Sequence, residues 1–343
     1  MKRLIYIGNF LSKNRQNPAP NVLIVTYLKS YFKVITSSSH KNIFIRFIDM
    51  LYTVLRFARH ENSVVVIDVF SSKAFYFAFF VASFCRFIKV KIILALHGGD
   101  LPSRYKRSPR LSDRLFNTAE LIIAPSKYLK RETESFFPVQ VEIFENPLQI
   151  EMYPYLPERN FDIPKIIWIR SFHVIYNPQL AIHVIKRTKQ YFPGAKLCMV
   201  GPDKDGSLHH CKALVKELGL EDTVEFTGFL NKAALVEKSK DCNIFINTTN
   251  FDNTPVSVVE AMALGLPVIT TNVGGIPDLI DHEINGLVIE PRNEQAFYDS
   301  IKRVMEDVML RNKIIINGRR KSETMAIQNI GLKWRRRIDE IIQ

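Results

Sequence analysis

Two acidic residues, Asp252 and Glu260, flank the start of a predicted helix. Between them lies the polar turn Asn253-Thr254-Pro255, and Pro255 suits a first helical position because its missing N–H costs little there. The free N–H groups of a helix start bind phosphate, and a nearby carboxylate accepts hydrogen bonds from ribose or sugar hydroxyls. Phosphate and hydroxyls together suggest a nucleotide or nucleotide sugar, and the alternative is an ordinary capped helix with solvated carboxylates.

The residues around this helix predict the elements that position it. A strand over residues 243–247 leads into the turn, Gly265 ends the helix, a buried strand follows over 267–270, and Gly274-Gly275 makes a second tight turn. From residue 165 onward, predicted strands and helices alternate, which indicates a parallel sheet with right-handed crossovers. Ligands of such sheets bind beyond the carboxyl ends of the strands, where we expect this corner to lie.

This stretch resembles the signature region of the retaining glycosyltransferases of family four, which have the two-domain GT-B architecture. The resemblance is spread over most of the chain and is strongest from about residue 196 to 291. At the first acidic position the family has Glu, whereas this chain has Asp252, which is shorter by one methylene. The matching residues are Glu260, Ala261-Met262-Ala263, Gly265, Pro267-Val268 and Gly274-Gly275.

The resemblance implies an α/β chain of the GT-B class, with two Rossmann-like domains that face each other across a cleft. We expect an acceptor-binding domain over residues 1–150 and a nucleotide-sugar-binding domain over 165–320, with a proline-bearing linker between them. A final helix over about 322–343 is expected to pack back onto the first domain. The 343 residues are enough for two domains of ordinary size.

Arg170 follows a predicted strand over residues 165–169, and its planar guanidinium can bind two oxygens of a pyrophosphate at once. The family pattern places a Lys several residues later, where this chain has Tyr176 and Asn177. The resemblance implies that the pyrophosphate of the donor is held by Arg170 and by N–H groups around Asn253, Thr254 and Pro255.

The resemblance also assigns the remaining contacts of the donor. It implies that Glu260 binds ribose hydroxyls, that Asp252 binds sugar hydroxyls and that the nucleobase lies beside Gly228 and Phe229. The ring of Phe229 either stacks on the base or belongs to the core. The sequence has no clear Asp-x-Asp cation motif, and the resemblance implies that neither a metal ion nor a cofactor is obligatory.

His97 follows a buried strand predicted over residues 91–96 and is succeeded by two glycines, which leave room for a ligand. A lone histidine is often structural, but this placement favours a functional role. The motif resembles the His-Gly on the acceptor side of family-four enzymes, where the histidine contacts the transferred sugar.

The positive charge is concentrated in the first part of the chain. Residues 1–150 contain 22 basic and 10 acidic residues, whereas residues 151–343 contain 25 and 24. This excess predicts an anionic partner, and nucleic acid is disfavoured because no nucleic-acid-binding motif is present. A membrane surface or a phosphorylated lipid fits better, although a solvated basic face is the alternative. The residues that we expect to face the acceptor or the membrane are Arg15, Asp100, Arg104, Lys106, Arg107 and Arg110.

Other sequence features indicate where in the cell the protein is located. The apolar run over residues 74–85 is shorter than the roughly 20 residues of a membrane span, so it predicts either a buried helix or one that also touches lipid. The N-terminus lacks a small-residue cleavage site and is interpreted as a strand rather than a signal peptide. The four widely spaced cysteines fit a reducing compartment. We therefore expect a cytoplasmic protein, peripheral at the inner face of the cell membrane.

The leading hypothesis is a retaining, hexosyltransferase-type enzyme that moves a sugar from a nucleotide-sugar donor to a glycan or lipid-linked acceptor, in cell-surface polysaccharide or glycolipid synthesis. The alternative is a non-catalytic nucleotide-sugar-binding assembly partner, which the departures at Asp252 and Tyr176 would suit. An epimerase or dinucleotide oxidoreductase is disfavoured because no GxGxxG fingerprint follows the first strand.

Overall fold

The structure is a computed structural model that describes residues 2–8, 10, 19–37, 40, 42–60, 62–98 and 100–343. Arg15 lies outside the described residues. The chain divides into two compact units, the first formed by Met1–Leu148 with Met325–Gln343 and the second by Gln149–Thr324. The segment that was expected to be a linker is bound to the second unit, because Arg159 donates hydrogen bonds to the carbonyl oxygens of Ser239, Cys242 and Leu264.

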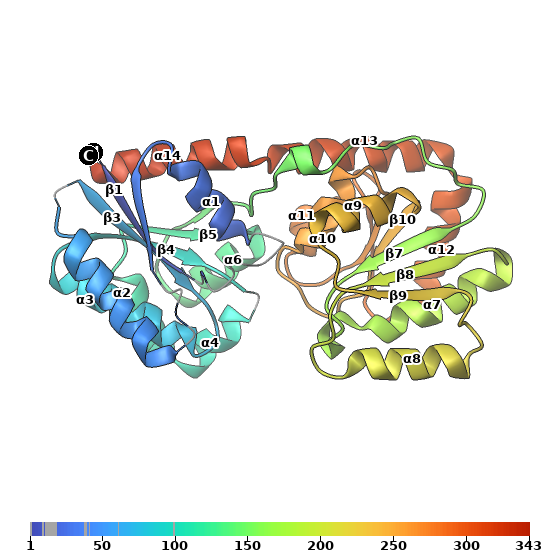
Figure 1. Cartoon of the computed structure of the whole chain (residues 1–343), viewed down its shortest axis with the longest axis horizontal. Helices are drawn as coiled ribbons and strands as arrows, with labels where there is room; N and C mark the ends of the chain where they lie inside the picture. The colour runs from blue at the N-terminus through green and yellow to red at the C-terminus, as the bar shows by residue number, and fades with distance from the viewer. Residues whose placement is uncertain are drawn as a thin grey trace. The chain divides into compact units, whose positions relative to one another are not determined.

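The first unit contains a six-stranded parallel sheet with the strand order β2-β1-β3-β4-β5-β6 (Figure 1). The strands are β1 (Arg3–Ile7), β2 (Lys33–Ser37), β3 (Ser63–Val69), β4 (Lys91–Leu96), β5 (Leu121–Ala124) and β6 (Val141–Ile143). The helices are α1 (Pro20–Leu28), α2 (Ile43–Phe57), α3 (Ala74–Phe87), α4 (Leu101–Arg107), α5 (Pro109–Phe116), α6 (Lys127–Phe136) and α14 (Ile327–Ile342).

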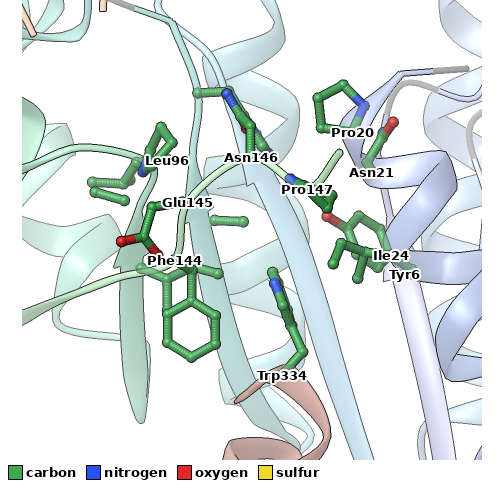
Figure 2. A pocket seen from close by; sticks show the side chains of 15 residues that line it. Tyr6, Pro20, Asn21, Ile24, Leu96, Phe144, Glu145, Asn146, Pro147 and Trp334 are labelled. Carbon is green, nitrogen blue, oxygen red and sulfur yellow. The ribbon is translucent and has the colours of Figure 1, made fainter. Parts of the chain in front are cut away.

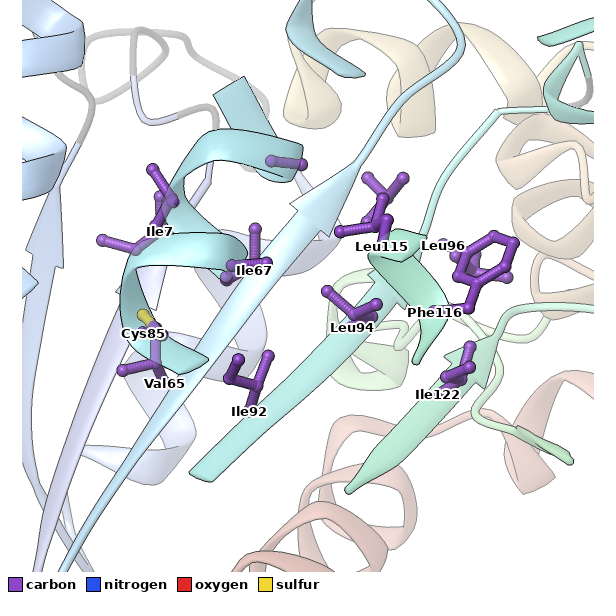
Figure 3. Packing of buried hydrophobic residues seen from close by; sticks show 14 of the residues in the cluster. Ile7, Val65, Ile67, Cys85, Ile92, Leu94, Leu96, Leu115, Phe116 and Ile122 are labelled. Atoms are coloured by element: carbon purple, nitrogen blue, oxygen red, sulfur yellow. The ribbon is translucent and has the colours of Figure 1, made fainter. Parts of the chain in front are cut away.

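Helices cover both faces of this sheet, which explains its nearly all-apolar strands. Every residue of β3 is buried. Figure 3 shows side chains of β3 and β4 packed against Cys85 of α3 and against Leu115 and Phe116 of α5. On the other face, α14 packs along α1, and its Trp334 and Ile338 are buried against β1 and β3. The last helix of the chain is therefore part of the first unit.

The second unit contains a six-stranded parallel sheet with the order β12-β11-β10-β7-β8-β9. The strands are β7 (Lys165–Ile169), β8 (Lys196–Val200), β9 (Val224–Gly228), β10 (Ile244–Asn247), β11 (Val268–Thr271) and β12 (Leu287–Ile289). The helices are η1 (Ile150–Met152), η2 (Val174–Tyr176), α7 (Pro178–Tyr191), α8 (Ser207–Glu217), α9 (Lys232–Lys240), α10 (Val256–Ala263), α11 (Ile276–Leu279), α12 (Glu294–Glu306) and α13 (Val308–Thr324).

The order of these strands reverses between β7 and β10. Strands later in the chain add on one side of this pair, and β8 and β9 add on the other. Such a reversal leaves a crevice at the carboxyl ends of the two strands, where ligands of open α/β sheets bind. Arg170 follows β7, and the turn at residues 252–255 follows β10.

Two helices differ in detail from their predictions. Pro255 precedes α10 as its N-cap instead of occupying its first turn, so the helix begins at Val256. Helix α3 has one buried side, but its Tyr76, Phe80 and Phe87 are exposed. Within the described residues, the helices are too short or too polar for any of them to cross a membrane.

Candidate functional site

Arg170 lies at the strand-order reversal of the second unit and is held there from two sides. Its guanidinium forms an ion pair with Asp252. It also lies over the ring of Tyr176, 4.6 Å from the ring centroid. Burial lowers the pKa of Arg170 to about 10, so the group is still a cation at neutral pH. The structure thus brings Arg170 and Asp252 together and places Tyr176, which stands where the family has Lys, beneath the arginine.

The loops that carry these residues are tied to each other by hydrogen bonds. The Asn250 N–H donates to the Ile175 carbonyl at 2.8 Å, and the Thr248 hydroxyl donates to the Tyr176 carbonyl at 2.9 Å. The Trp168 indole N–H lies 3.0 Å from the same hydroxyl. The loop after β7 and the loop after β10 therefore form one connected support for Arg170.

The Gly274-Gly275 pair packs directly on the turn before α10. A Cβ atom at Gly274 would lie 1.9 Å from the Asp252 carbonyl oxygen, and one at Gly275 would lie 2.2 Å from the Asn253 carbonyl oxygen. The Gly275 N–H donates to the Asp252 carbonyl at 3.0 Å. These glycines are needed because the two backbone segments approach too closely for any side chain.

The start of α10 offers donors to an oxyanion. Pro255 provides no side-chain cap, and the first helical hydrogen bond runs from Val258 N–H to the Pro255 carbonyl at 3.1 Å. The N–H groups of Val256 and Ser257 precede that bond, as at any helix N-terminus. Among the described residues, the buried Ser257 hydroxyl and Arg170 Nε have no hydrogen-bond partner. Buried polar groups normally have one, so this corner is suited to a ligand rich in acceptor oxygens.

Glu260 is buried further along α10 beside Tyr153 and Lys232, two residues that no sequence pattern pointed to. The Tyr153 hydroxyl donates to Glu260 Oε1 at 2.9 Å, and the Lys232 ammonium pairs with the same oxygen. Lys232 occupies the first position of α9, which is capped by the Asn231 side chain. Burial lowers the pKa of Lys232 to about 8. No motif links Lys232 to Glu260, because their contact depends on how α9 and α10 are placed in the fold.

The end of β9 resolves the alternative left open for Phe229. Gly228 adopts φ +71°, a conformation that favours glycine, and turns the chain at the end of the strand. The Phe229 side chain is 53% exposed, so it is not a core residue. The exposed ring can stack on a planar ligand.

In the first unit, the candidate site is arranged around Asp68, which lies near the end of β3 and whose side chain bonds to three other residues. This buried carboxylate accepts hydrogen bonds from the Tyr6 hydroxyl at 2.9 Å and from Asn21 Nδ2 at 3.1 Å. His97 Nε2 lies 2.9 Å from Asp68 Oδ1, and the imidazole stacks on Phe70. Since a carboxylate only accepts hydrogen bonds, Nε2–H of His97 is the donor in this hydrogen bond.

Asp68 is not among the residues that the sequence patterns pointed to. A Cβ atom at Gly8 would lie 2.3 Å from Asp68 Oδ2, so the carboxylate fits closely against β1. Burial and the Asp68 charge raise the pKa of Tyr6. Figure 2 shows Tyr6, Asn21 and Trp334 around a small pocket of about 30 Å³, whose lining also includes His97.

The basic residues that follow His97 do not form a single surface. Arg104 is buried, donates to the Ser71 carbonyl at 2.7 Å and packs on Phe75 and Tyr76, which corrects the expectation that it is surface-facing. Lys106, Arg107 and Arg110 are exposed. Arg107 pairs with the exposed carboxylate of Asp100 at 3.2 Å. This ion pair offsets part of the positive charge of the three exposed basic residues.

The described residues contain no cluster of three or more His, Cys, Asp or Glu side chains suited to a metal ion. The four cysteines are free and buried.

The two parallel sheets and the strand-order reversal define a doubly wound α/β architecture, whose ligands bind at the carboxyl ends of the strands beside the reversal. Residues 160–321 match the family model described as Glycosyl transferases group 1. The matched residues include Arg170, Lys232 and the whole β10–α10 corner. Residues 160–321 are therefore similar to the group 1 glycosyl transferases, and the resemblance to retaining family four is consistent with that match.

Curated relatives match a larger part of the chain. The putative glycosyltransferase YtcC of Bacillus subtilis is 27% identical over 259 residues, which are 68% of this chain and 63% of the relative. The amylovoran biosynthesis glycosyltransferase AmsK of Erwinia amylovora is 22% identical over 279 residues, which are 75% of this chain and 65% of the relative. The chain therefore spans slightly less than two thirds of the length of these relatives.

A solved structure matches nearly the whole chain. HepE of Anabaena in complex with UDP-glucose has a TM-score of 0.77 at 17% identity, with 99% of this chain and 100% of that chain covered. This likeness confirms the prediction of a GT-B fold.

Proposed function

We propose that this protein is a retaining glycosyltransferase of the hexosyltransferase type, which moves a sugar from a nucleotide-sugar donor to a glycan or lipid-linked acceptor. Its product would belong to a cell-surface polysaccharide or glycolipid. The observation that carries the proposal is Arg170, a buried cation held by Tyr176 and Asp252 at the strand-order reversal, beside the N-terminus of α10.

In this proposal, the pyrophosphate of the donor binds to Arg170 and to the N–H groups at the start of α10. Arg170 then exchanges its ion pair with Asp252 for one with phosphate oxygens, and the Asp252 carboxylate accepts hydrogen bonds from sugar hydroxyls. Negative charge on the departing nucleoside diphosphate grows as the glycosidic bond breaks. Fixed donors and a fixed cation stabilise that charge without reorganisation, which lowers the barrier to transfer.

Glu260 and Phe229 would bind the nucleoside. Tyr153 and Lys232 both contact Oε1 of Glu260, so we assign the ribose hydroxyls to Oε2. The exposed ring of Phe229 would stack on the base. HepE binds UDP-glucose, which makes UDP-sugars the first donors to test.

We assign the acceptor to the first unit. There, His97 would contact the transferred sugar, with Asp68 fixing the orientation and tautomer of its ring. We also propose that the protein acts at the inner face of the cell membrane as a cytoplasmic, peripheral protein. No metal ion or cofactor is obligatory in this proposal, since Arg170 and the helix N-terminus supply the positive charge.

A transfer assay tests the activity. The protein is incubated with nucleotide sugars and a lipid extract, and sugar incorporation and the anomeric configuration of the product are measured. We expect incorporation with retention, unchanged by EDTA and abolished in Asp252→Ala. Inversion or loss of activity with EDTA would overturn the corresponding part of the proposal.

A non-catalytic assembly partner that binds nucleotide sugars is the second candidate, because Asp252 is already paired with Arg170. This candidate predicts donor binding without turnover for every donor and acceptor that is tried.

A further inference from the structure

Two neighbouring helices of the first unit expose large apolar side chains to solvent. Helices α2 and α3 lie side by side (Figure 1), and Phe47 of α2 contacts Phe80 of α3 with ring centroids 6.1 Å apart. The exposed apolar residues, which together we call the α2–α3 surface, are Ile43, Phe44, Ile45, Ile48, Tyr52 and Leu55 on α2 and Tyr76, Phe80 and Phe87 on α3.

The exposure on α2 follows from the helix having two apolar faces. Its buried face packs on the core through Met50 and Val54. On the opposite side, Phe44 is 78% exposed and Ile48 is 65% exposed. At 3.6 residues per turn, the five exposed residues from Phe44 to Leu55 fall within a sector of about 100°. Contiguous apolar surface of this kind indicates an interaction site.

The charges at the edges of this surface are positive. Residues 42–59 contain one acidic residue, Asp49, which accepts a hydrogen bond from Ser37, and residues 73–89 contain none. The exposed basic residues of the two segments are Arg56, Arg59, Lys73, Arg86 and Lys89. Apolar side chains rimmed by cations match the interfacial zone of a bilayer that contains anionic lipids.

We propose that the α2–α3 surface docks the first unit onto an anionic lipid bilayer, with Phe44, Ile48 and Tyr52 inserted among the lipids and the basic residues at the headgroups. This inference deepens the peripheral attachment proposed above by naming the surface that makes it. Docking onto the bilayer requires no bound donor. A second copy of the chain fits less well, because a twofold contact would bring the same cations against each other.

The test uses the full chain and sedimentation with phosphatidylcholine vesicles, prepared with or without a third of phosphatidylglycerol. We expect binding that depends on phosphatidylglycerol. Combining Phe44→Ser, Ile48→Ser and Tyr52→Ser lowers the partition coefficient at least about tenfold, because three apolar side chains no longer insert. Combining Arg56→Gln and Arg59→Gln lowers it about fivefold per charge. Met309→Ser, at an exposed apolar residue of the second unit, is the control and leaves binding unchanged.

A rival surface is included in the same experiment. If Lys106→Gln, Arg107→Gln and Arg110→Gln together abolish vesicle binding while the triple serine variant binds normally, the proposal is wrong. It is also wrong if the wild type does not bind anionic vesicles, or if it forms dimers in sedimentation velocity that the serine variant lacks. The UDP-induced rise in melting temperature is measured for each variant. An unchanged rise shows that donor binding is intact, which separates this proposal from the proposed activity.

Discussion

At the scale of single residues, Tyr176 accounts for the missing family Lys. The sequence placed a tyrosine where a second cation was expected, and the structure puts its ring under the guanidinium of Arg170. A cation over an aromatic face gains about 0.5–2 kcal/mol, with the larger value at desolvated sites. Tyr176 therefore orients the guanidinium of Arg170.

This role makes a prediction for Tyr176→Leu. Losing the ring contact should weaken UDP binding about three- to tenfold, because Arg170 is less well fixed. The matched control is Tyr298→Leu, which removes the ring under Arg187, an arginine away from the corner. Titration calorimetry compares the two. Equal affinities would mean that Asp252 alone positions Arg170.

Lys232 gives a pH-dependent prediction. Burial lowers its pKa to about 8, whereas an ordinary lysine titrates near about 10.4. Only the neutral amine is nucleophilic, so acylation of Lys232 should rise as the pH passes through 8, well below the range for ordinary lysines. Peptide mass spectrometry after brief labelling measures this, and bound UDP should protect the residue. Labelling that rises only near pH 10, or no protection, would remove Lys232 from the donor site.

The sequence identified some site residues and missed others for a physical reason. Arg170, Asp252 and Glu260 stand in local patterns, at the end of a strand or around a helix start, that have meaning without the fold. Lys232 and Asp68 have a recognisable role only through their contacts in the fold. Lys232 pairs with Glu260, 28 positions away, and Asp68 bonds to His97, 29 positions away. Arg104 was misjudged because a charged residue in a basic run looks solvated, although its guanidinium is bound by a carbonyl.

At the scale of elements, the β10–α10 corner depends on the glycine turn after β11. Gly274→Ala should displace Asp252, since the new Cβ would lie 1.9 Å from its carbonyl oxygen. We expect a loss of about 2 kcal/mol or more in the free energy of unfolding, together with weaker UDP binding. Gly206→Ala is the control for backbone strain, because Gly206 also has positive φ but has room for a Cβ.

Chemical denaturation and calorimetry compare these two variants. If Gly274→Ala costs no more stability than Gly206→Ala and binds UDP normally, the corner tolerates movement and the proposed rigidity is wrong.

Helix α2 marks the limit of prediction at this scale. The spacing of apolar residues over 42–59 predicts a helix, which the structure contains. It does not say which apolar face is buried, because both faces are apolar. Only the packing of Met50 and Val54 against the sheet shows that Phe44, Ile48 and Tyr52 remain exposed.

At the scale of the whole molecule, the alternation of strands and helices from residue 165 onward predicted one parallel sheet, and the family resemblance implied a second domain of the same kind. The structure contains two parallel sheets. The exact boundary between the two units could not be predicted from the sequence. The proline-bearing segment that ends at Pro164 was expected to be a linker, yet Arg159 and Tyr153 bind it into the second unit. The excess of basic residues in 1–150 was evident from composition, but its distribution over surfaces was not.

The central claim is that the second unit binds the nucleoside diphosphate of a sugar donor through Arg170. Titration calorimetry of UDP into the full chain tests this claim, with Arg170→Ala beside Arg187→Ala, which changes a partly exposed arginine of α7. We expect the wild type and Arg187→Ala to bind UDP with equal affinity. Arg170→Ala should lose about thirtyfold or more, because a buried cation that meets phosphate is removed. Equal binding of UDP by Arg170→Ala and the wild type would show that Arg170 does not bind the diphosphate.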